Sequence, residues 1–397
     1  MFKSIQIVPD IFYVGVNDRQ KALFENIIPL DKGVSYNSYL ILDEKTALID
    51  AVDVSLAPLF IEKLQAQLQG RKLDYLIINH IEPDHSGAIS FLRKYHPEMT
   101  IVGNSKTLSM LEGFYGLDDN LLEIKEEGIL SLGKHELQFY LAPMVHWPET
   151  MLTYDKTAKV LFSGDAFGGF GTLDGAVIDK DMNVDKYWDE MIRYYANIIG
   201  KYGSPVQKAL QKIKALPIEY ICSTHGPVWH EKIDEVVSVY DRLSKYEAEE
   251  GVVIVYGSMY GNTELMAETV AQGVAESGIK DVIVHNVSKS DSSDILRDIF
   301  KYRGLIVGSP TYNNELHPDV EPLLRKIEIR SMKNRQFGYF GSFSWAGAAV
   351  KRMSAFVEKM GWAVADTVVE QKQSLREENY KACLQLGREV AEMVKKG

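Results

Sequence analysis

The sequence has 397 residues, of which 46% are hydrophobic and 25% are charged, as expected for a globular protein of two or three domains. The formal net charge of −11 argues against nucleic-acid binding, because that function needs clustered positive charge. The sequence has no apolar signal-peptide core at its start and no apolar run of membrane-spanning length, so we expect no membrane insertion. The two cysteines, Cys222 and Cys383, lie in different halves and predict a reducing, cytoplasmic setting.

The first half of the chain is rich in predicted strands. Residues 35–50 have the pattern of two strands joined by a charged turn, and residues 56–68 have the pattern of a helix. An apolar strand ends at Asn79, and the next helix is expected to begin near Ser86. Further strands are predicted at 100–104, 135–142, 151–155 and 159–165. This mixture is typical of a layered αβ domain rather than of a simple doubly wound sheet.

The pattern changes near residue 250. The amphipathic, charged segment 233–249 predicts one continuous helix, and regular strand–helix alternation follows it. Strands are predicted at 252–256, 282–287, 304–308, 337–342 and 362–369, and helices at 263–277, 319–328, 346–360 and 376–396. The alternation predicts a doubly wound parallel sheet. We therefore expect two domains, residues 1–249 and residues 250–397.

The segment H-I-E-P-D-H-S-G at residues 80–87 directly follows the strand that ends at Asn79. His80 and Glu82 are two positions apart and can point the same way, while Asp84 and His85 are expected to enter the following loop. Each of three more candidates follows an apolar strand elsewhere in the first half: His146, Asp165 and His225. We expect these seven side chains to converge at one edge of the sheets. A helix cap with incidental histidines is the alternative.

The order of these residue types, H-x-x-x-D-H followed by a distant His, Asp and His, resembles the metallo-β-lactamase superfamily. Members of that superfamily place two metal ions at one edge of an αβ/βα sandwich, and its hydrolases usually have H-x-H-x-D-H and bind zinc. Glu82 takes the place of the second histidine here. Zinc favours His and Cys ligands, whereas mixed imidazoles and carboxylates suit non-haem iron, which changes oxidation state. The replacement favours redox chemistry, with zinc, which also accepts carboxylates, as the alternative.

The strand at 252–256 runs into G-S-M-Y-G-N-T and then into a predicted helix. Small residues, hydroxyls and a helix N-terminus together form a cradle for an anion. The lack of G-K-[ST] argues against a nucleoside triphosphate, and a lysine-free cradle suits the phosphate monoester of FMN. Two further loops, at 309–314 and 341–347, follow parallel strands at the edge where ligands bind. A plain structural turn, with Tyr312 and Trp345 half-buried, is the alternative.

The three loops together resemble those of flavodoxin. By that resemblance, Tyr312 and Trp345 are expected to lie against an isoalloxazine ring. The implied FMN-binding residues are Ser258, Met259, Tyr260, Gly261, Asn262, Thr263, Ser309, Pro310, Thr311, Tyr312, Asn313, Ser342, Phe343, Ser344, Trp345, Ala346 and Gly347.

A di-metal domain with H-x-E-x-D-H followed by a flavodoxin domain resembles one family, the flavodiiron proteins, over nearly the whole chain. The resemblance implies two irons that share one bridging carboxylate: the first held by His80, Glu82, His146 and Asp165, the second by Asp84, His85, Asp165 and His225. Tyr194 matches a tyrosine near the metals of some members, with a core aromatic as its alternative role. The implied reaction is reduction of dioxygen to water, or of nitric oxide to nitrous oxide, by electrons that pass from an external donor through FMN.

The same resemblance implies a donor and an assembly. Trp345 in G-S-F-S-W-A-G is more similar to members that use rubredoxin than to those that use a deazaflavin. Residues 251–397 contain 19 Lys/Arg and 18 Asp/Glu, against 25 and 37 in residues 1–250, so the second domain is the better surface for an acidic carrier. The sequence shows no nicotinamide fingerprint, which predicts slow oxidation of NADH. We expect the minimal two-domain class, without an appended module, and a head-to-tail homodimer or a dimer of dimers.

Two other functions stay open from the residues. One is a zinc hydrolase fused to an electron-transfer domain, and the other is a flavin-based redox sensor or carrier whose metal domain is only structural. Metal analysis separates the first alternative, and turnover with dioxygen or nitric oxide separates the second.

Overall fold

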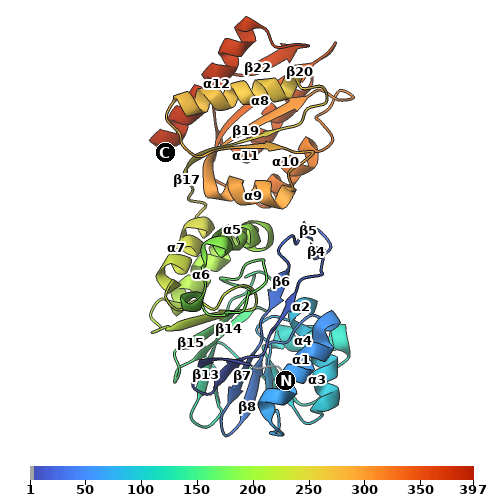
Figure 1. Ribbon diagram of the computed structural model, residues 1–397, viewed down its shortest axis with the longest axis vertical. Coiled ribbons are helices and arrows are strands. Elements are labelled where there is room, and N and C mark those ends of the chain that lie inside the picture. The colour runs from blue at the N-terminus through green and yellow to red at the C-terminus, as the bar shows by residue number, and fades with distance from the viewer. Residues whose placement is uncertain (1–3) are drawn as a thin grey trace. The chain divides into compact units, whose positions relative to one another are not determined.

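The chain folds into two compact units in the computed structural model, which describes residues 4–397 (Figure 1). The first unit contains the residues up to Tyr195 together with Tyr202–Asp241, and the second contains Ala196–Lys201 together with Arg242–Gly397. Met1–Lys3, part of the segment that lacks a signal-peptide core, lie outside the described residues. The domain limits 1–249 and 250–397 concern independently folding domains and stay a prediction. No helix in the described part of the chain is long and apolar enough to span a bilayer.

Two mixed sheets form the centre of the first unit. The larger sheet has the order β1 (Ile5–Val8), β2 (Ile11–Tyr13), β7 (Tyr39–Leu42), β8 (Thr46–Ile49), β9 (Tyr75–Ile77), β10 (Thr100–Gly103) and β11 (Leu121–Glu123). The smaller sheet has the order β12 (Ile129–Ser131), β13 (Glu136–Leu141), β14 (Met151–Asp155), β15 (Val160–Gly164) and β16 (Tyr220–Ser223). Their facing sides share one apolar core, to which β7 contributes Ile41 and β15 contributes Phe162. Burial of that core holds the sheets face to face.

Helices cover the outer sides of both sheets (Figure 1). Beside the larger sheet lie α1 (Ala57–Leu68), α3 (Ile89–Tyr95) and α4 (Ser105–Tyr115), and beside the smaller sheet lie α5 (Asp185–Tyr194), α6 (Gly203–Ile213) and α7 (Ile233–Ser244). Trp188 of α5 stacks on Trp229 at 5.3 Å between ring centroids. Two short pairs lie outside the sheets, β3 (Val16–Asp18) with β6 (Val34–Tyr36) and β4 (Leu23–Phe24) with β5 (Ile28–Pro29). The predicted αβ/βα sandwich is confirmed.

The second unit is a parallel sheet with helices on both faces. The strand order is β18 (Val282–Asn286), β17 (Glu249–Tyr256), β19 (Tyr302–Pro310) and β20 (Gln336–Phe343), and β20 also pairs with β21 (Ala363–Val364) and β22 (Val369–Lys372). α8 (Asn262–Glu276) and α12 (Glu377–Lys396) share a core with Val252 and Ile254 of β17. α9 (Ser292–Lys301), α10 (Val320–Ile329) and α11 (Ala349–Met360) complete the unit (Figure 1). The predicted doubly wound sheet is confirmed.

The segment predicted as one helix over 233–249 is shorter than expected. α7 ends at Ser244, and β17 begins at Glu249. Tyr246 takes the left-handed φ of 59°, and its N–H donates to the Leu243 carbonyl (3.0 Å) while the Glu247 N–H donates to the Arg242 carbonyl (3.0 Å). This pair of bonds ends a helix in the manner of a Schellman motif. The prediction of a continuous helix is therefore wrong.

The strand predicted over 362–369 is interrupted. The Thr367 N–H and hydroxyl donate to the two carboxylate oxygens of Glu389 on α12 (2.8 and 2.7 Å), so a side chain takes the place of the neighbouring strand. On either side of this contact, β21 and β22 pair with β20.

Five helices were not predicted from the pattern: the short α2 (Pro83–Ser86), α4, α5, α6 and α9. α9 is only ten residues long, yet it buries Ile295, Leu296, Ile299 and Phe300 on one side, and Asp291 caps it by accepting from the Ser293 N–H (2.7 Å).

Candidate metal centre and cofactor pocket

The first candidate ligands are placed by the chain that leaves β9. Asp50, directly after β8, accepts hydrogen bonds from the backbone N–H groups of Asn79 (2.8 Å) and His80 (3.4 Å). Asn79 Nδ2 donates to the other oxygen of Asp50 (3.2 Å). These bonds join two adjacent strand ends and hold the backbone of His80 in place.

The next turn is helical. α2 (Pro83–Ser86) begins at Pro83, where the missing N–H costs no helical bond, and the Ser86 hydroxyl donates to the carbonyl of Ile81 (2.6 Å). Asp84 and His85 lie within this turn and are buried. The expectation that they enter a loop is therefore wrong, because the proline and the serine close a short helix at that point.

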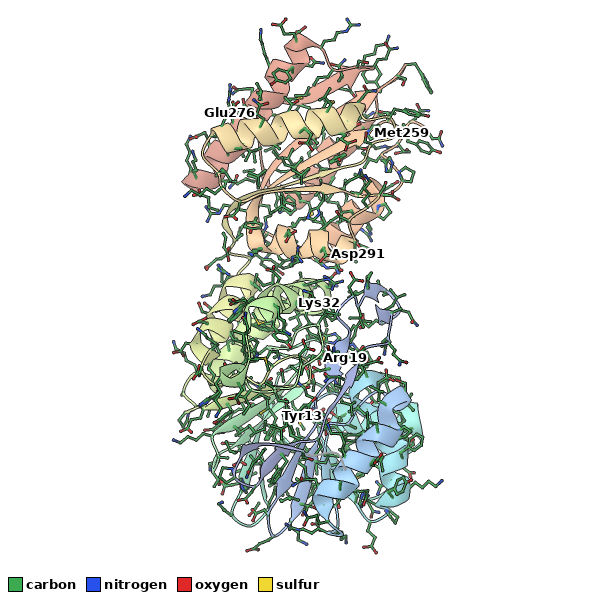
Figure 2. The ribbon with its side chains drawn as sticks, viewed as in Figure 1. Tyr13, Arg19, Lys32, Met259, Glu276 and Asp291 are labelled. Atoms are coloured by element: carbon green, nitrogen blue, oxygen red, sulfur yellow. The ribbon has the colours of Figure 1, made fainter. Side chains whose placement is uncertain are left out.

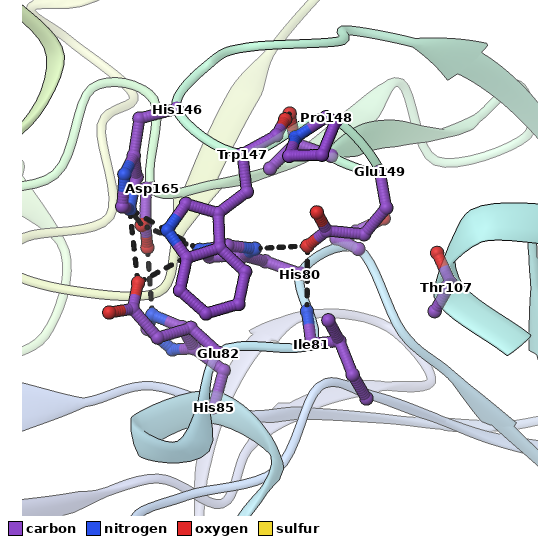
Figure 3. A network of polar contacts seen from close by, with 12 residues as sticks. His80, Ile81, Glu82, His85, Thr107, His146, Trp147, Pro148, Glu149 and Asp165 are labelled. Atoms are coloured by element: carbon purple, nitrogen blue, oxygen red, sulfur yellow. Dashed lines mark hydrogen bonds and ion pairs between the residues drawn. The ribbon is translucent and has the colours of Figure 1, made fainter. Parts of the chain in front are cut away.

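The first group of candidate ligands contains His80, Glu82, His146 and Asp165 (Figure 3). Glu82 Oε2 lies 3.0 Å from Nε2 of His80 and 3.0 Å from Nε2 of His146. Asp165 Oδ2 lies 3.2 Å from Nε2 of His146 and 3.5 Å from Nε2 of His80. All four residues are at most 8% exposed, so their polar atoms meet each other largely away from water.

The second group contains Asp84, His85 and His225. Asp84 places one oxygen 3.3 Å from Nε2 of His85 and the other 3.3 Å from Nε2 of His225. Asp165 Oδ1 lies 2.8 Å from Nε2 of His85, while its Oδ2 faces the first group. Asp165 therefore presents one oxygen to each group, which is the geometry of a bridging carboxylate.

Several of these atoms face each other without making hydrogen bonds. The side-chain atoms that are buried and have no hydrogen-bond partner within residues 4–397 include both oxygens of Asp84, both ring nitrogens of His85, Oδ2 of Asp165 and Nε2 of His225. The Asp84 oxygens lie 3.3 Å from Nε2 of His85 and of His225. These distances would allow hydrogen bonds, but the angles do not. Lone pairs aimed at a common centre, and left unpaired at high cost, fit a bound cation.

The charges of the pocket also favour a cation. Burial lowers the pKa of His80, but the carboxylates of Asp165, Glu149 and Glu82 outweigh burial and hold that pKa well above its ordinary value. Burial raises the pKa of Glu82, yet hydrogen bonds with His146 and His80 bring it below its ordinary value. The pocket thus stabilises positive charge. Four imidazoles and three carboxylates without a thiolate match non-haem iron better than zinc.

Tyr194 lies beside the second group. It is the last residue of α5, it is 1% exposed, and its ring centroid is 5.4 Å from that of His225. Burial, followed by the charges of Asp165 and Asp84, raises the pKa of Tyr194 well above its ordinary value. The phenol therefore keeps its proton. Phe24 and Phe170 pack edge-on against Tyr194 and close this side of the pocket with apolar atoms.

Residues that support the ligands were missed from the sequence. Glu149 holds the ring of His80 (2.6 Å), Thr224 donates to Asp165 Oδ1 (2.7 Å), and the carbonyl of Ser35 accepts from His225 Nδ1 (2.7 Å). Glu149 follows His146 by three positions and Thr224 precedes His225, so proximity to a candidate ligand was an available signal. The carbonyl of Ser35 had none.

A pocket in the second unit opens among the three predicted loops. Its lining contains Ser258, Met259, Tyr260, Asn262, Thr263, Pro310, Thr311, Ser342, Phe343, Ser344 and Gln373. Gln373 was not predicted. The other predicted residues lie off this lining: Gly261, Ser309, Tyr312, Asn313, Trp345, Ala346 and Gly347. Figure 2 shows Met259 at the N-terminal end of α8.

The N-terminus of α8 is open to an anion. Gly261 is its N-cap with φ 87°, and no side chain bonds the first turn from that position. The Ser258 hydroxyl instead accepts from the Gly261 N–H (3.1 Å), and the Thr263 hydroxyl lies 2.9 Å from that of Ser342. Free N–H groups, hydroxyls and the positive end of the helix dipole suit a phosphate.

Among the predicted residues outside the lining, one makes a hydrogen bond within its loop and two are exposed aromatics. The Ser309 hydroxyl accepts from the His317 N–H (2.9 Å) inside its loop, while Trp345 is 87% exposed and Tyr312 is 42% exposed. Tyr260, which does line the pocket, is 90% exposed. Half-buried packing, the alternative role of Trp345, is therefore excluded.

Comparison with known protein families gives one match in each half of the chain, and both matches agree with the observed folds. Residues 34–226 match the family described as ODP family beta lactamase, and residues 254–387 match the flavodoxin family. Together with the site geometry, these matches define a two-unit protein that pairs a metal domain of β-lactamase fold with a flavodoxin domain.

Full-length relatives narrow this class. The chain is 32% identical to an anaerobic nitric oxide reductase flavorubredoxin of Vibrio vulnificus over 98% of this chain and 80% of the relative. Its structure matches the rubredoxin oxygen:oxidoreductase of Desulfovibrio gigas (TM-score 0.94, 29% identity, 99% of each chain). It also matches the flavodiiron protein of Giardia intestinalis (TM-score 0.96, 27% identity, 100% of this chain and 98% of that chain). The chain belongs to the flavodiiron protein family, and the predicted cofactors, FMN and a diiron centre, are confirmed at the level of the family.

Proposed function

We propose that this chain is an oxidoreductase that reduces dioxygen to water, nitric oxide to nitrous oxide, or both, at a non-haem diiron centre supplied with electrons through FMN. The observation that carries the proposal is the pair of buried ligand groups with Asp165 between them, on a chain whose second unit has an open phosphate cradle. The printed names of the relatives, nitric oxide reductase and oxygen oxidoreductase, support the same two gases.

The ligand assignment follows the two groups. His80, Glu82 and His146 would hold one iron, and Asp84, His85 and His225 would hold the other, with Asp165 shared. When bound, the iron pair supplies open coordination positions and electrons for the gas, and FMN passes on electrons from the donor.

The chain's own residues prepare the pocket for this chemistry. The Ser35 carbonyl fixes the proton of His225 on Nδ1, so the Nε2 lone pair faces the centre. Tyr194 keeps its phenol proton beside the carboxylates and can donate a hydrogen bond into the pocket. Its apolar neighbours Phe24 and Phe170 exclude water from this side.

The electron donor is proposed to be a small acidic protein such as rubredoxin. The near-neutral charge of residues 251–397, against the strongly acidic first 250 residues, favours docking at the second unit. Rates of FMN reduction by the donor should fall as salt rises, and NADH alone should reduce FMN slowly.

We also propose a head-to-tail homodimer or a dimer of dimers, located in the cytoplasm. Ile27, whose N–H donates to the carbonyl of Phe24, is 65% exposed, and Trp345 of the third flavin loop is 87% exposed. A partner subunit would cover these apolar side chains. Both cysteines are free and buried, as in a reducing compartment. Mixing a His85/His225 double variant with a variant that cannot bind FMN should restore activity after subunit exchange, and no recovery despite proven exchange would overturn the head-to-tail arrangement.

The function is tested by metal analysis joined to turnover. Protein purified without air should contain two irons per chain, as the two ligand groups imply, and should consume nitric oxide or dioxygen with a reduced donor. Tightly bound zinc, with no gas reduction after iron reconstitution, would support the zinc hydrolase alternative instead. Iron-containing protein that exchanges electrons but turns over neither gas would support the redox sensor.

A further inference from the structure

A buried carboxylate lies directly behind the first ligand group. Glu149 is 1% exposed, and its Oε1 accepts from His80 Nδ1 (2.6 Å) and from the Ile81 N–H (3.1 Å) (Figure 3). The first bond is short for a nitrogen donor, as charge-assisted bonds are. It fixes the His80 proton on Nδ1 and leaves the Nε2 lone pair facing Glu82, His146 and the centre.

The second group has no such support. His225 Nδ1 donates to the neutral carbonyl of Ser35 (2.7 Å). His85 Nδ1 is buried and has no hydrogen-bond partner among the residues that the structure describes. The two groups therefore resemble each other in their ligands but differ behind the rings: an anion lies behind His80 in the first group, whereas His225 in the second group has a neutral carbonyl behind it and His85 has no partner.

Glu149 is itself held by α4. Asn104 Nδ2 donates to the Glu149 carbonyl (2.5 Å), and Asn104 Oδ1 caps the helix by accepting from the N–H groups of Lys106 (3.1 Å) and Thr107 (3.2 Å). Figure 3 shows Thr107 on the far side of Glu149 from His80. This attachment holds the backbone of Glu149 in place, while the carboxylate meets His80 and Ile81.

We propose that Glu149 is a positioning residue that acts through His80 to make the first metal position the tighter of the two. A carboxylate that accepts the outer N–H of a ligating imidazole fixes the ring and strengthens its other nitrogen as a donor. Within residues 4–397, His80 is the one ligand histidine whose outer nitrogen meets a carboxylate. This inference rests on the proposed function, because it concerns the affinity of the metal centre assigned there.

The test measures metal affinity on the folded full-length chain. Metal-free protein is titrated with Fe²⁺ without air against a competing chelator, which gives the affinity of each ion. Glu149→Gln keeps an acceptor for His80 and Ile81 but removes the charge. We expect it to weaken the tighter ion by about 10- to 100-fold and to leave the weaker ion within about threefold.

Two backgrounds assign the effect to its position. In a His225→Ala background, which damages the second group, Glu149→Gln should still weaken the remaining ion. In a His80→Ala background it should add nothing, because residues that act through one another are not additive. Glu98→Gln, an exposed carboxylate paired with Lys72 (2.9 Å), is the matched control and should leave both affinities unchanged.

Outcomes that overturn the proposal are distinct from failure to fold. Equal weakening of both ions, no weakening, or an undiminished effect in the His80→Ala background would overturn it. If Glu149→Gln does not fold, Glu149→Asp is used, which keeps the charge but withdraws it by one methylene. It should weaken the affinity for the tighter ion, by less than the factor of about 10 to 100 expected for Glu149→Gln. Wild-type protein that binds fewer than two ions would overturn the proposed function itself, whereas two ions with Glu149→Gln unchanged would overturn only this inference.

Discussion

In the first unit, the candidate ligands are buried side chains, and His80, His85 and His225 are each at most 1% exposed. In the second unit, the pocket is lined by loop residues and by the adjoining ends of α8, β19 and β20, and Tyr260 in its lining and Trp345 outside it are almost wholly exposed. The metal centre therefore depends on single charged groups whose loss leaves others unpaired. The flavin pocket distributes binding over backbone groups and hydroxyls, so each contributes modestly.

The largest effect is expected for Asp165→Ala. Because Asp165 faces both ligand groups, its loss should empty both positions, and gas reduction should fall by more than about 100-fold, while FMN content stays unchanged. Elemental analysis and a flavin assay measure the two cofactors. Asp84→Ala is the control, since it should spare the first position. Retention of one iron and of activity in Asp165→Ala would contradict the bridging role.

A pH-dependent effect is expected at a buried pair away from the ligands. His135 Nδ1 donates to Asp155 (2.6 Å), and this bond outweighs burial and raises the pKa of His135. The stability that this pair contributes is fully present below the pKa of histidine in the unfolded chain, about 6.5. It is lost as pH rises through the raised pKa of His135 in the folded protein. His135→Asn should therefore cost about 1–2 kcal/mol at pH 6 and less at pH 9.

Denaturant unfolding at several pH values measures this trend. His96 provides the contrast, because burial lowers its pKa, so protonation of His96 should weaken the fold as pH falls and His96→Asn should remove that weakening. A destabilisation by His135→Asn that is independent of pH would show that the pair is neutral.

A smaller effect is expected in the flavin pocket. Thr263→Ala removes the hydroxyl that meets Ser342 (2.9 Å) and should weaken FMN binding by about 1 kcal/mol, or about fivefold. Iron content should not change. Complete loss of FMN from this one substitution would break the contrast between the units.

The smallest effect on stability is expected for Trp345→Ala. The side chain is 87% exposed, so the free energy of unfolding should change by less than about 0.5 kcal/mol. The rate of FMN reduction by the protein donor should fall all the same if the exposed ring belongs to the docking surface. An unchanged donor rate would remove Trp345 from that surface.

The sequence predicts the metal centre better than it predicts the elements around it. Ligands such as His80 and Asp165 sit directly after apolar strands, and strand ends of one sheet edge meet in space. Asp84 and His85 were misplaced because a proline can open a helical turn as readily as a loop. The carbonyl of Ser35 behind His225 carries no signal in its residue type, since every residue has a carbonyl.

The errors in the second half have tertiary causes. The helix predicted to residue 249 ends early because Tyr246 accepts a left-handed conformation usually taken by glycine. The last strand is divided because Glu389, distant in sequence, takes the N–H of Thr367. Glu389, and Arg335, which donates to the Tyr246 carbonyl (3.0 Å), are partners that local pattern does not contain.

The central claim is that two irons held by the seven side chains reduce the gas with electrons from FMN. The most direct measurement compares iron-loaded with zinc-loaded protein, each with FMN reduced without air and then mixed with nitric oxide in a single turnover. We predict that the iron-loaded protein consumes nitric oxide and oxidises its flavin, while the zinc-loaded protein keeps its flavin reduced. Equal flavin oxidation and nitric oxide consumption in the two proteins would contradict the account.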